Sequence, residues 1–304
     1  SMNTNIKRFL GIITLTIAFL FLYRNNSFKH LQYLGIFESP GAVWLRNLRV
    51  LRDKMSNVGR HVFLNESLGV RNNTNSFRIS VWRHGQALEG RFIKNYGDGK
   101  SDPFKNCPVR NCHITYDDDN VIGADAVFFH LQETMGPQTL PKDRTPNQRW
   151  IFYTEESPHH TFLLTKEYVL RDYNGMFNWS MTYRSDSDIP AAYGHTVPLE
   201  MPLDKPILYN KTKFVVQMNS HCGGANNRMA YIKNLTQYIP IDIYGRCGPL
   251  KCNDNVLHFY SDCTNINDYK FYLAFENSNC KEYITEKVWW QAIHKGAVPV
   301  VYGG

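Results

Sequence analysis

Two glutamates follow directly after a short apolar run in the first half of the chain. The run "RWIFYT" ends at Thr154, Glu155 and Glu156 come next, and Pro158 enforces a turn. Paired carboxylates at the end of a strand suit acid–base chemistry, because a carboxylate with a charged neighbour can accept or hold a proton near neutral pH. Adjacent side chains on an extended chain point to opposite sides, so only one of these acids faces a given pocket. The alternative is a pair of solvated loop acids, and the two histidines that follow are interpreted as surface residues.

Two cationic residues fall where helices are expected to begin. Arg228 follows the loop "NSHCGGANN" after an apolar run, and Lys287 follows Glu286 at the head of a helical pattern over about 285–295. A helix start offers backbone N–H groups to an anion, and the Gly-Gly pair lets backbone approach a ligand. The pattern predicts a diphosphate site in which a carboxylate accepts hydrogen bonds from a sugar or base. Taken alone, Glu286 is equally well explained as an acid favoured by the helix dipole.

The elements that must position these residues fall into two blocks joined by the proline-rich stretch 197–206. In the first block, short runs of β-branched and aromatic residues predict strands at 77–82, 126–131, 149–156 and 180–184. In the second block strands and helices alternate, with strands at 214–218, 241–245, 270–275 and 297–303, helices at 225–238 and about 285–295, and Gly296 as a C-cap.

The alternation of strand and helix in the second block predicts βαβ units and a parallel sheet. Ligands of such sheets bind at the carboxyl ends of the strands. Ser220, Glu276 and Asn277 fall at such ends. The fold class indicated is therefore α/β.

Residues 9–23 form an uncharged apolar stretch flanked by basic residues. They are fewer than the roughly 20 residues that span an average bilayer, but early secretory membranes are thinner. No small-x-small cleavage pattern follows, so we predict an N-terminal transmembrane anchor, with residues 1–8 as a cytoplasmic tail and the polar range 24–75 as a stem. A cleaved signal peptide is the alternative.

Sequons and cysteines agree with a lumenal location for the remainder. Asn-x-Ser/Thr sequons begin at Asn25, Asn65, Asn72, Asn178, Asn210 and Asn234. Short spacing among the seven cysteines predicts local disulfides between Cys107 and Cys112 and between Cys247 and Cys252, with Cys263 as a competing partner. The net charge of +7 suits an anionic ligand or a membrane surface but is too small to indicate nucleic acid.

Four segments of the chain together resemble the α1,3-fucosyltransferase family. They are "RWIFYTEESP", "FNWSMTYRSDSDIPAAYG", "NSHCGGANNRMAYIKNLTQYIPIDIYGRCGPLKC" and "FYLAFENSNCKEYITEKVWW" with the later "GAVPVV". The similarity covers about 77–304, is most specific over 270–287, and is nearest to invertebrate enzymes that modify N-glycan cores. It implies a GT-B-like fold of two Rossmann-like domains facing a cleft, with the acceptor site in 76–205 and the GDP-fucose site in 206–304.

The resemblance also implies roles for individual residues. Glu156 matches the family's catalytic base, Arg228 and Lys287 match pyrophosphate ligands, and Glu276 matches a residue of the donor-fucose site. Further donor-site positions are Asn277, Tyr283 and Glu286, and weaker matches are Ser220, Tyr244 and Gly245. His221 departs from the asparagine more usual after that serine, which leaves the local donor contacts open.

The implied reaction is an inverting transfer of L-fucose from GDP-fucose to O3 of GlcNAc in an N-glycan or other GlcNAc-containing acceptor. No cofactor is required, and Mn²⁺ is at most stimulatory. The expected location is the Golgi membrane, as a single-pass type II protein with its catalytic part in the lumen. The family's donor domain normally continues past the strand at 297–303, so we expect that domain to be incomplete and full activity only for a longer version.

Two alternatives use other features of the chain. Asp186-Ser187-Asp188 is a literal Asp-x-Asp, a pattern that holds a divalent ion in many nucleotide-sugar enzymes, and Asp117 to Asp119 form a second acidic run. Short acidic patterns are common by chance, and aspartate is favoured in turns. A metal-dependent transferase using Asp186 and Asp188 remains one alternative, and a non-catalytic glycan-binding fragment is the other.

Overall fold

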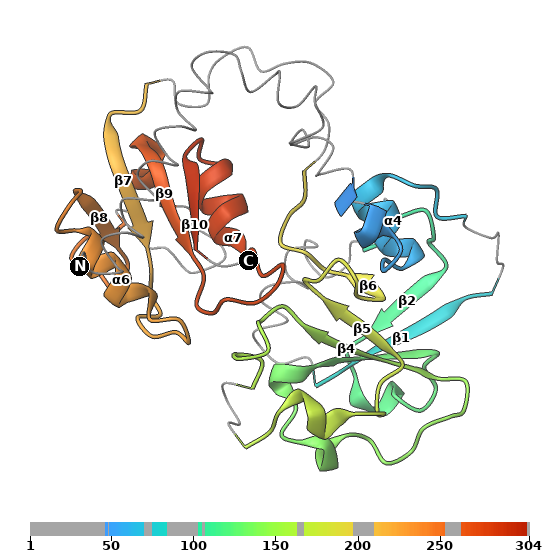
Figure 1. Ribbon diagram of the computed structural model, residues 1–304. Helices are drawn as coiled ribbons and strands as arrows, with labels where there is room; N and C mark the ends of the chain where they lie inside the picture. Colours follow the sequence, from blue (N-terminus) through green and yellow to red (C-terminus); the bar gives the residue numbers. More distant parts are fainter. Residues whose placement is uncertain are drawn as a thin grey trace, which may run out of the picture. The chain divides into compact units, whose positions relative to one another are not determined.

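The structure is a computed structural model that describes residues 46–47, 49–69, 75–83, 103–104, 107–162, 167–196, 210–252 and 263–302. The chain divides into two compact units, Ser1–Lys54 and Met55–Gly304, and every strand among the described residues belongs to the second (Figure 1). The predicted anchor at 9–23 and the proline-rich stretch 197–206 lie outside the described residues. Within the described part, no helix is both long enough and apolar enough to cross a membrane.

The first sheet has six parallel strands in the order β2-β1-β3-β4-β5-β6. They are β1 (Phe77–Trp82), β2 (Cys112–Thr115), β3 (Ala126–His130), β4 (Arg149–Thr154), β5 (Trp179–Thr182) and β6 (Ile189–Pro190). All four strands predicted for this block are confirmed within about two residues. β2 and β6 were not predicted, because β6 has only two residues and β2 begins at Cys112, which we assigned to a local disulfide loop.

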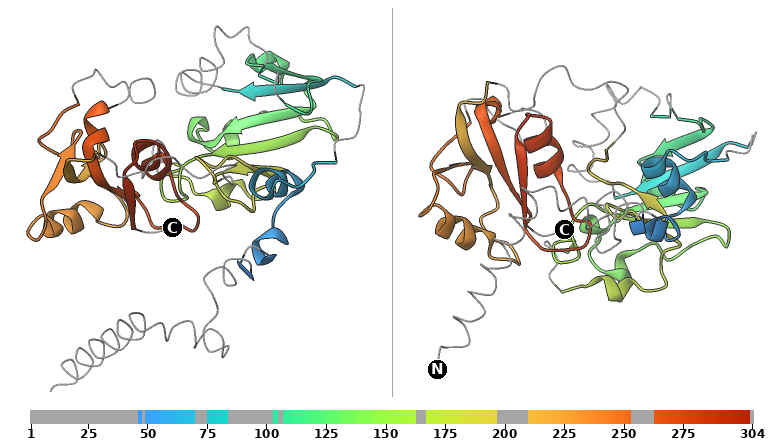
Figure 2. Two further views of the ribbon diagram at one scale, coloured as in Figure 1. Left: turned by 90° about the horizontal axis from the view of Figure 1, so that it is seen from above. Right: turned by 45° about the horizontal axis from the view of Figure 1, so that its top comes forward.

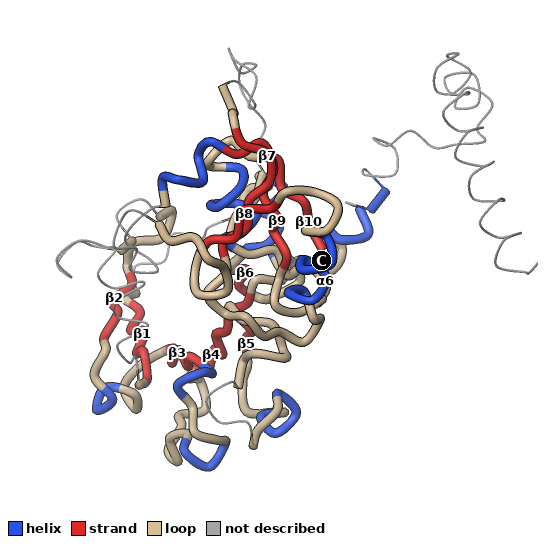
Figure 3. The backbone as a smooth tube through the Cα atoms, turned by 90° about the vertical axis from the view of Figure 1, so that its left-hand side faces the viewer, coloured by secondary structure: helices blue, strands red, loops and turns tan. Residues whose placement is uncertain are grey.

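Alternate residues of the first sheet pack on opposite faces. Val127 and Phe129 of β3 pack with Trp150 of β4 on one face, while Phe128 and Tyr153 pack on the other. The connections are mainly loops and 3-10 turns (Figure 3): η3 (Asp118–Asn120), η4 (Leu131–Glu133), η5 (Pro137–Thr139) and η6 (Leu170–Tyr173). Since β4 is buried between β3 and β5, the position of the two glutamates after Thr154 is fixed by the core.

The second sheet has four parallel strands in the order β10-β9-β7-β8. They are β7 (Lys213–Met218), β8 (Ile241–Tyr244), β9 (Tyr269–Phe275) and β10 (Val298–Tyr302), with α6 (Arg228–Leu235), η7 (Thr264–Asp268) and α7 (Glu286–Val288) between them. The predicted parallel sheet is confirmed. The helix expected at about 285–295 is instead the short α7 running into a π-helical turn, η8 (Trp289–Ile293), and Gly296 follows it with φ 67°.

Helical segments cover both faces of the second sheet, as expected for a doubly wound sheet. Ile232 of α6 packs against Val215 and Leu273 on one face. Val288 and Ala292, from α7 and η8, pack with residues of the other face, and this segment lies beside β9 and β10 (Figure 2). The strict alternation of the strand side chains between these two cores holds β7 and β9 in register.

The winding of the second sheet reverses between β7 and β9. From β7 the chain moves to β8 on one side, and then returns to β9 on the other side of β7. In open α/β sheets, ligands bind outside the carboxyl ends of the strands at such a reversal. The loops after β7 and β9, which carry most of the predicted site residues, meet at this point.

A short helix, α4 (Asn57–Leu64), lies inside the range that we expected to be stem. Its N-cap Ser56 accepts a hydrogen bond from Gly59 N at 3.0 Å. The helix packs beside β6, where a β-carbon on Gly59 would lie 3.1 Å from Ser185 O. The helix was not predicted, because eight residues are too few to show a clear period in a polar sequence.

Both predicted disulfides are wrong. The structure joins Cys222 to Cys247 and Cys252 to Cys263, and Cys107, Cys112 and Cys280 are free thiols. Cys222 and Cys247 follow the neighbouring strands β7 and β8, so the sheet brings their Cα atoms to 5.3 Å although 25 residues separate them. The competing partner, Cys263, is the one that Cys252 takes. Cys112 is instead the first residue of β2, where pairing with Phe77 fixes its position.

Candidate functional site

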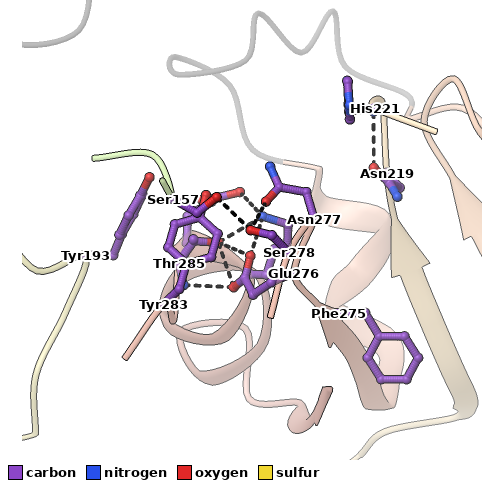
Figure 4. Close-up of polar contacts among 12 residues, drawn as sticks. Ser157, Tyr193, Asn219, His221, Phe275, Glu276, Asn277, Ser278, Tyr283 and Thr285 are labelled. Carbon is purple, nitrogen blue, oxygen red and sulfur yellow. Dashed lines mark hydrogen bonds and ion pairs between the residues drawn. The ribbon is translucent and has the colours of Figure 1, made fainter. Parts of the chain in front are cut away.

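Glu276 lies directly after β9 and is 1% exposed. Its Oε1 accepts from Thr285 N at 2.8 Å and from Thr285 Oγ1 at 2.9 Å, and Lys287 Nζ lies 3.0 Å from its Oε2 (Figure 4). A buried carboxylate is stable only when it is paired and hydrogen-bonded in this way. Glu276 therefore connects the end of β9 to the start of α7 and fixes the position of Lys287.

Lys287 contacts two carboxylates. Besides Glu276, its Nζ lies 3.1 Å from Glu286 Oε1 and 2.8 Å from Thr285 Oγ1. Burial lowers the pKa of Lys287, but the charges of Glu286 and Glu276 outweigh burial and raise it above the usual value. For Glu286 burial raises the pKa, but Lys287 outweighs it and the net pKa is lowered. Both groups are therefore charged at neutral pH.

The start of α7 differs from the expected open anion site. The N-cap residue is Thr285, whose backbone N–H already donates to Glu276. Glu276 therefore takes up the N–H of the N-cap residue, and binding of a phosphate by the backbone N–H groups that follow and by Lys287 stays a prediction.

Arg228 is the first residue of α6, as predicted, and is 2% exposed. Its Nη1 donates to Phe275 O at 2.7 Å, and its Nη2 donates to His221 O at 2.8 Å and Asn219 Oδ1 at 3.0 Å. Burial lowers the pKa of Arg228 while Glu276 opposes that shift, and an arginine stays charged under either influence. The guanidinium thus holds the loops after β7 and β9 together, and among the described residues its Nε has no hydrogen-bond partner.

The glycine pair after β7 allows those two loops to touch. A β-carbon at Gly224 would lie 2.7 Å from Asn277 O, and Ala225 N donates to the same oxygen at 2.8 Å. Asn226 Nδ2 also donates to Glu276 O at 3.0 Å. Gly224 therefore serves a close approach of backbone to backbone, whereas we expected the glycine pair to let backbone approach a ligand.

Glu156, from the turn after β4, reaches the same cluster from the first sheet. Tyr283 Oη donates to Glu156 Oε2 at 2.9 Å, and Ser278 Oγ donates to Ser157 Oγ at 2.7 Å (Figure 4). Glu155 accepts instead from Tyr153 Oη at 2.9 Å. The two adjacent acids therefore have partners on different sides, and of the two it is Glu156 that contacts Tyr283.

His160 is a site residue that sequence reasoning missed. We expected both histidines after Pro158 to lie at the surface, but His160 is 5% exposed and only His159 is exposed. His160 Nδ1 lies 3.2 Å from Ser157 Oγ, and its ring centroid is 6.2 Å from that of His221. Burial lowers the pKa of His160, and the charge of Glu156 acts in the opposite direction.

The weaker predicted donor residues lie in the turn after β8 and the loop after β7. Tyr244 is buried in the core with its hydroxyl 3.5 Å from that of Tyr269. Gly245 has φ 90° and packs against Asn219 O, and Ser220 O accepts from Arg246 Nε at 3.0 Å. The described contacts of these three residues are structural. They give no support to a role beside Glu156, Glu276 and Lys287.

The Asp-x-Asp carboxylates have separate local partners. Asp186 forms an ion pair with Arg184, whose hydrogen bond is the main cause of the lowered pKa of Asp186. Asp188 Oδ2 accepts from Ser180 N and Ser180 Oγ, each at 2.8 Å. Within the described residues no group of three or more histidines, cysteines or acids is arranged to hold a metal ion.

Four of the predicted sequons lie in described parts of the chain, and their asparagines are exposed: Asn65, Asn178, Asn210 and Asn234. Asn178 also accepts a hydrogen bond from Trp150 N at 2.8 Å through Oδ1. Asn25 and Asn72 lie outside the described residues. Glycosylation of these asparagines stays a prediction.

Two models of one protein family match this chain. "Fucosyltransferase, N-terminal" matches residues 74–194, and "Glycosyltransferase family 10 (fucosyltransferase) C-term" matches residues 208–304. The two matched regions coincide with the parts of the chain that form the first and the second sheet.

Curated relatives and a solved structure are also similar. Glycoprotein 3-alpha-L-fucosyltransferase A of Drosophila melanogaster is 37% identical over 204 residues, which cover 65% of this chain and 38% of that protein. Human 4-galactosyl-N-acetylglucosaminide 3-alpha-L-fucosyltransferase FUT6 is 38% identical over 198 residues, covering 64% of this chain and 52% of that protein. This chain therefore spans about half of these relatives or less. A crystal structure of alpha1,3-fucosyltransferase aligns with a TM-score of 0.42 and 18% identity, covering 77% of this chain and 71% of that one.

Proposed function

The chain belongs to glycosyltransferase family 10, the fucosyltransferases, and from this premise we propose that it transfers L-fucose from GDP-fucose to O3 of a GlcNAc residue, with inversion, to form an α1,3 linkage. The names of its relatives specify 3-alpha-L-fucosyl transfer. The observation that carries the proposal is the hydrogen bond from Tyr283 to Glu156. This hydrogen bond places the carboxylate of Glu156, which follows a strand of the first sheet, beside the ion pair of Glu276 and Lys287. That ion pair lies where the winding of the second sheet reverses.

The proposed arrangement is GT-B-like. Residues 76–205 hold the acceptor, and residues 206–304 hold the donor. Each part has its own parallel sheet and its own hydrophobic core, which is what two Rossmann-like domains require. The donor is assigned to the second sheet because the loops after β7 and β9 meet where its winding reverses.

In the proposed reaction Glu156 acts as the general base. Its carboxylate removes the proton from O3 of GlcNAc while that oxygen attacks C1 of fucose on the face opposite to GDP. The sugar ring passes through an oxocarbenium-like transition state, as in glycoside hydrolysis. General-base assistance of this kind contributes roughly 10²- to 10⁴-fold to the rate.

The departing GDP gains negative charge, which the proposal assigns to Lys287 and Arg228. Lys287 exchanges its contact with Glu286, whose side chain is 40% exposed, for a phosphate oxygen while Glu276 keeps the amine in place. Arg228 holds the loop after β7 in shape through its hydrogen bonds to His221 O and Phe275 O, and it adds a fixed positive charge there. Cations held where charge develops stabilise the transition state without reorganisation.

The proposed acceptor is a glycoprotein N-glycan or another GlcNAc-containing glycan. The two relatives are named for different acceptors, and identities of 37% and 38% do not decide between these acceptors. We propose that no cofactor is required and that Mn²⁺ at most stimulates. The proposed location is the Golgi membrane, with residues 9–23 as a type II anchor. Exposure of Asn65, Asn178, Asn210 and Asn234 is compatible with glycosylation in the lumen.

The test measures transfer from radiolabelled GDP-fucose to a GlcNAc-terminated or N-glycan acceptor, together with GDP binding. We expect Glu156→Gln to abolish transfer, a loss of at least about 10²-fold, and to retain GDP binding. Glu155→Gln is the matched control, because glutamine can still accept from Tyr153 and the side chain faces away from the site.

Other outcomes would contradict the proposal in distinct ways. Loss of GDP binding in Glu156→Gln would contradict the role of Glu156 as base, and transfer only from another sugar nucleotide would contradict the donor. Loss of activity in EDTA with rescue by Mn²⁺ would favour the mechanism that uses Asp186 and Asp188. Glycan binding without affinity for GDP would favour a non-catalytic module.

A further inference from the structure

The segment from Ser278 to Tyr283 is attached to the first sheet by side chains at three points. Besides the Ser278–Ser157 and Tyr283–Glu156 hydrogen bonds, Glu282 Oε2 accepts from Ser185 N at 2.7 Å and from Ser185 Oγ at 2.8 Å. Ser185 and Glu282 are 97 residues apart in the chain. The loop after β9 therefore depends on the first sheet for its shape, although it is built on the second.

Glu282 adopts a backbone conformation that is uncommon for its residue type. Its φ is 62°, in the left-handed region, which costs a residue with a β-carbon free energy unless its surroundings hold it there. The two hydrogen bonds from Ser185 supply that restraint. The reversal at Glu282 sends its side chain toward Ser185 and the next side chain, Tyr283, into the interior, where it is 2% exposed.

Tyr283 is fixed by packing as well as by its hydrogen bond. Its ring lies 4.9 Å from the ring of Tyr183, which comes from the strand end just before Ser185. Burial and the neighbouring Glu156 both raise the pKa of Tyr283, so its hydroxyl keeps the proton that it donates. A phenol held in this way can contact only one oxygen of Glu156.

We propose that Tyr283 is a positioning residue for the base Glu156, and that the contact between Glu282 and Ser185 holds Tyr283 in place. This inference rests on the proposed function. Tyr283 donates to Oε2 and leaves Oε1 of Glu156 for the acceptor hydroxyl. The resemblance assigned Tyr283 to donor binding, whereas its hydrogen bond in this structure connects it to the base.

Two titratable side chains bear directly on Glu156. They are Tyr283, from the loop after β9, and His160, from the same turn as Glu156. His160 is itself influenced by the charges of His159, His221 and Arg228. Removal of the Tyr283 hydroxyl takes away its hydrogen bond to Glu156 Oε2, so the carboxylate is no longer held in one orientation. Turnover should then fall without a matching rise in KM, whereas a lost donor contact would raise KM.

The kinetic test compares the wild-type full chain with Tyr283→Phe, Glu282→Ala and Glu282→Gln. We expect Tyr283→Phe to lower kcat by roughly 10- to 100-fold, with KM for GDP-fucose nearly unchanged. Glu282→Ala should lower kcat in the same direction, and Glu282→Gln should restore it, because an amide oxygen still accepts from Ser185. Lys233→Ala is the control, since Lys233 is an exposed residue of α6. A raised KM with unchanged kcat in Tyr283→Phe would overturn the inference and return Tyr283 to donor binding.

A second measurement tests the hydrogen bond between Tyr283 and Glu156 without relying on enzyme activity. In thermal unfolding, the Tm shifts of Tyr283→Phe and Glu156→Ala should not add in the double variant, because each removes the same hydrogen bond. Additive shifts would overturn the inference whatever the kinetics show. Failure of the wild-type chain to transfer fucose contradicts the proposed function separately, because it does not alter the Tm comparison.

Discussion

Glu276 shows how a single buried carboxylate organises the site at the scale of one residue. It neutralises Lys287, caps the start of α7 through Thr285, and its backbone oxygen accepts from Asn226. Breaking such a buried pair from one side leaves an uncompensated charge, which costs about 3–5 kcal/mol. The residues around Glu276 are therefore coupled, and a change in one of them affects both stability and binding.

Lys287→Ala should weaken GDP binding by roughly 10- to 100-fold, because a charge-assisted hydrogen bond contributes about 1.5–3 kcal/mol. The same change should lower Tm, since Glu276 stays buried without its counter-charge. Isothermal titration with GDP and a thermal scan measure the two effects. Lys281→Ala, an exposed lysine of the same loop, should change neither, and equal effects of the two variants would contradict a specific role for Lys287.

His160 should make stability depend on pH. Burial lowers its pKa below the ordinary value of about 6.5. As the pH falls, the unfolded chain therefore binds a proton before the folded chain does, and stability is lost from about pH 6.5 down to the lower folded pKa. His160→Gln should flatten the fall in Tm between about pH 7 and pH 5, whereas the exposed His159→Gln should leave it intact. An unchanged slope in His160→Gln would contradict this assignment.

At the scale of elements, the site is made by two loops that touch because β7 and β9 are adjacent. Arg228 spans them from α6, and Ala225 N donates to Asn277 O. These contacts within the chain set the shape of both loops. The spacing of the strands, rather than either loop alone, determines where Lys287 and Arg228 lie.

Gly224→Ala should disrupt this loop contact. A β-carbon there would lie 2.7 Å from Asn277 O, and backbone cannot yield as a flexible side chain does. We expect a loss of stability of about 1–3 kcal/mol and weaker GDP binding, measured by denaturant unfolding and by titration. Gly223→Ala is the matched control, because its nearest neighbour is the end of the His221 side chain at 3.6 Å. Equal stability of the two variants would contradict the account.

At the scale of the whole molecule, two disulfides fasten the second sheet at the ends of its strands. Cys222–Cys247 joins the loops after β7 and β8, and Cys252–Cys263 closes the segment that leads back to β9. Both disulfides precede Glu276 and Lys287 in the sequence. They restrain the connections between strands whose register determines the site.

Peptide mapping without reduction should recover Cys222 joined to Cys247 and Cys252 joined to Cys263, with the other three thiols alkylated. The double variant Cys222→Ala/Cys247→Ala should lose about 2–4 kcal/mol of stability, measured by denaturant unfolding. A matched control is Cys280→Ala, a free thiol that should have little effect. Recovery of Cys247 joined to Cys252 would restore the pairing that spacing suggested.

Much of the fold could be predicted from the sequence because local patterns carry it. The apolar runs that became β1, β3, β4, β7 and β9 are visible as periods of two or as continuous buried stretches. Arg228 at a helix start and Glu156 at a strand end were also readable, because each lies within a few residues of a clear boundary. The short elements β6 and α4 were not, because so few residues define no clear period, and β2 was not, because Cys112 was assigned to a local disulfide loop.

The sequence by itself determined the chemical type of the site residues and their positions along the chain. It indicated a parallel α/β protein with an acid after one strand and cations at two helix starts. Only the tertiary structure decided which groups meet. It paired Cys222 with Cys247, buried His160, closed the start of α7 with Glu276 and brought Tyr283 to Glu156. The physical reason is that these contacts join residues that are distant in the chain, and their partners are selected by the order of strands in the sheets rather than by any local pattern.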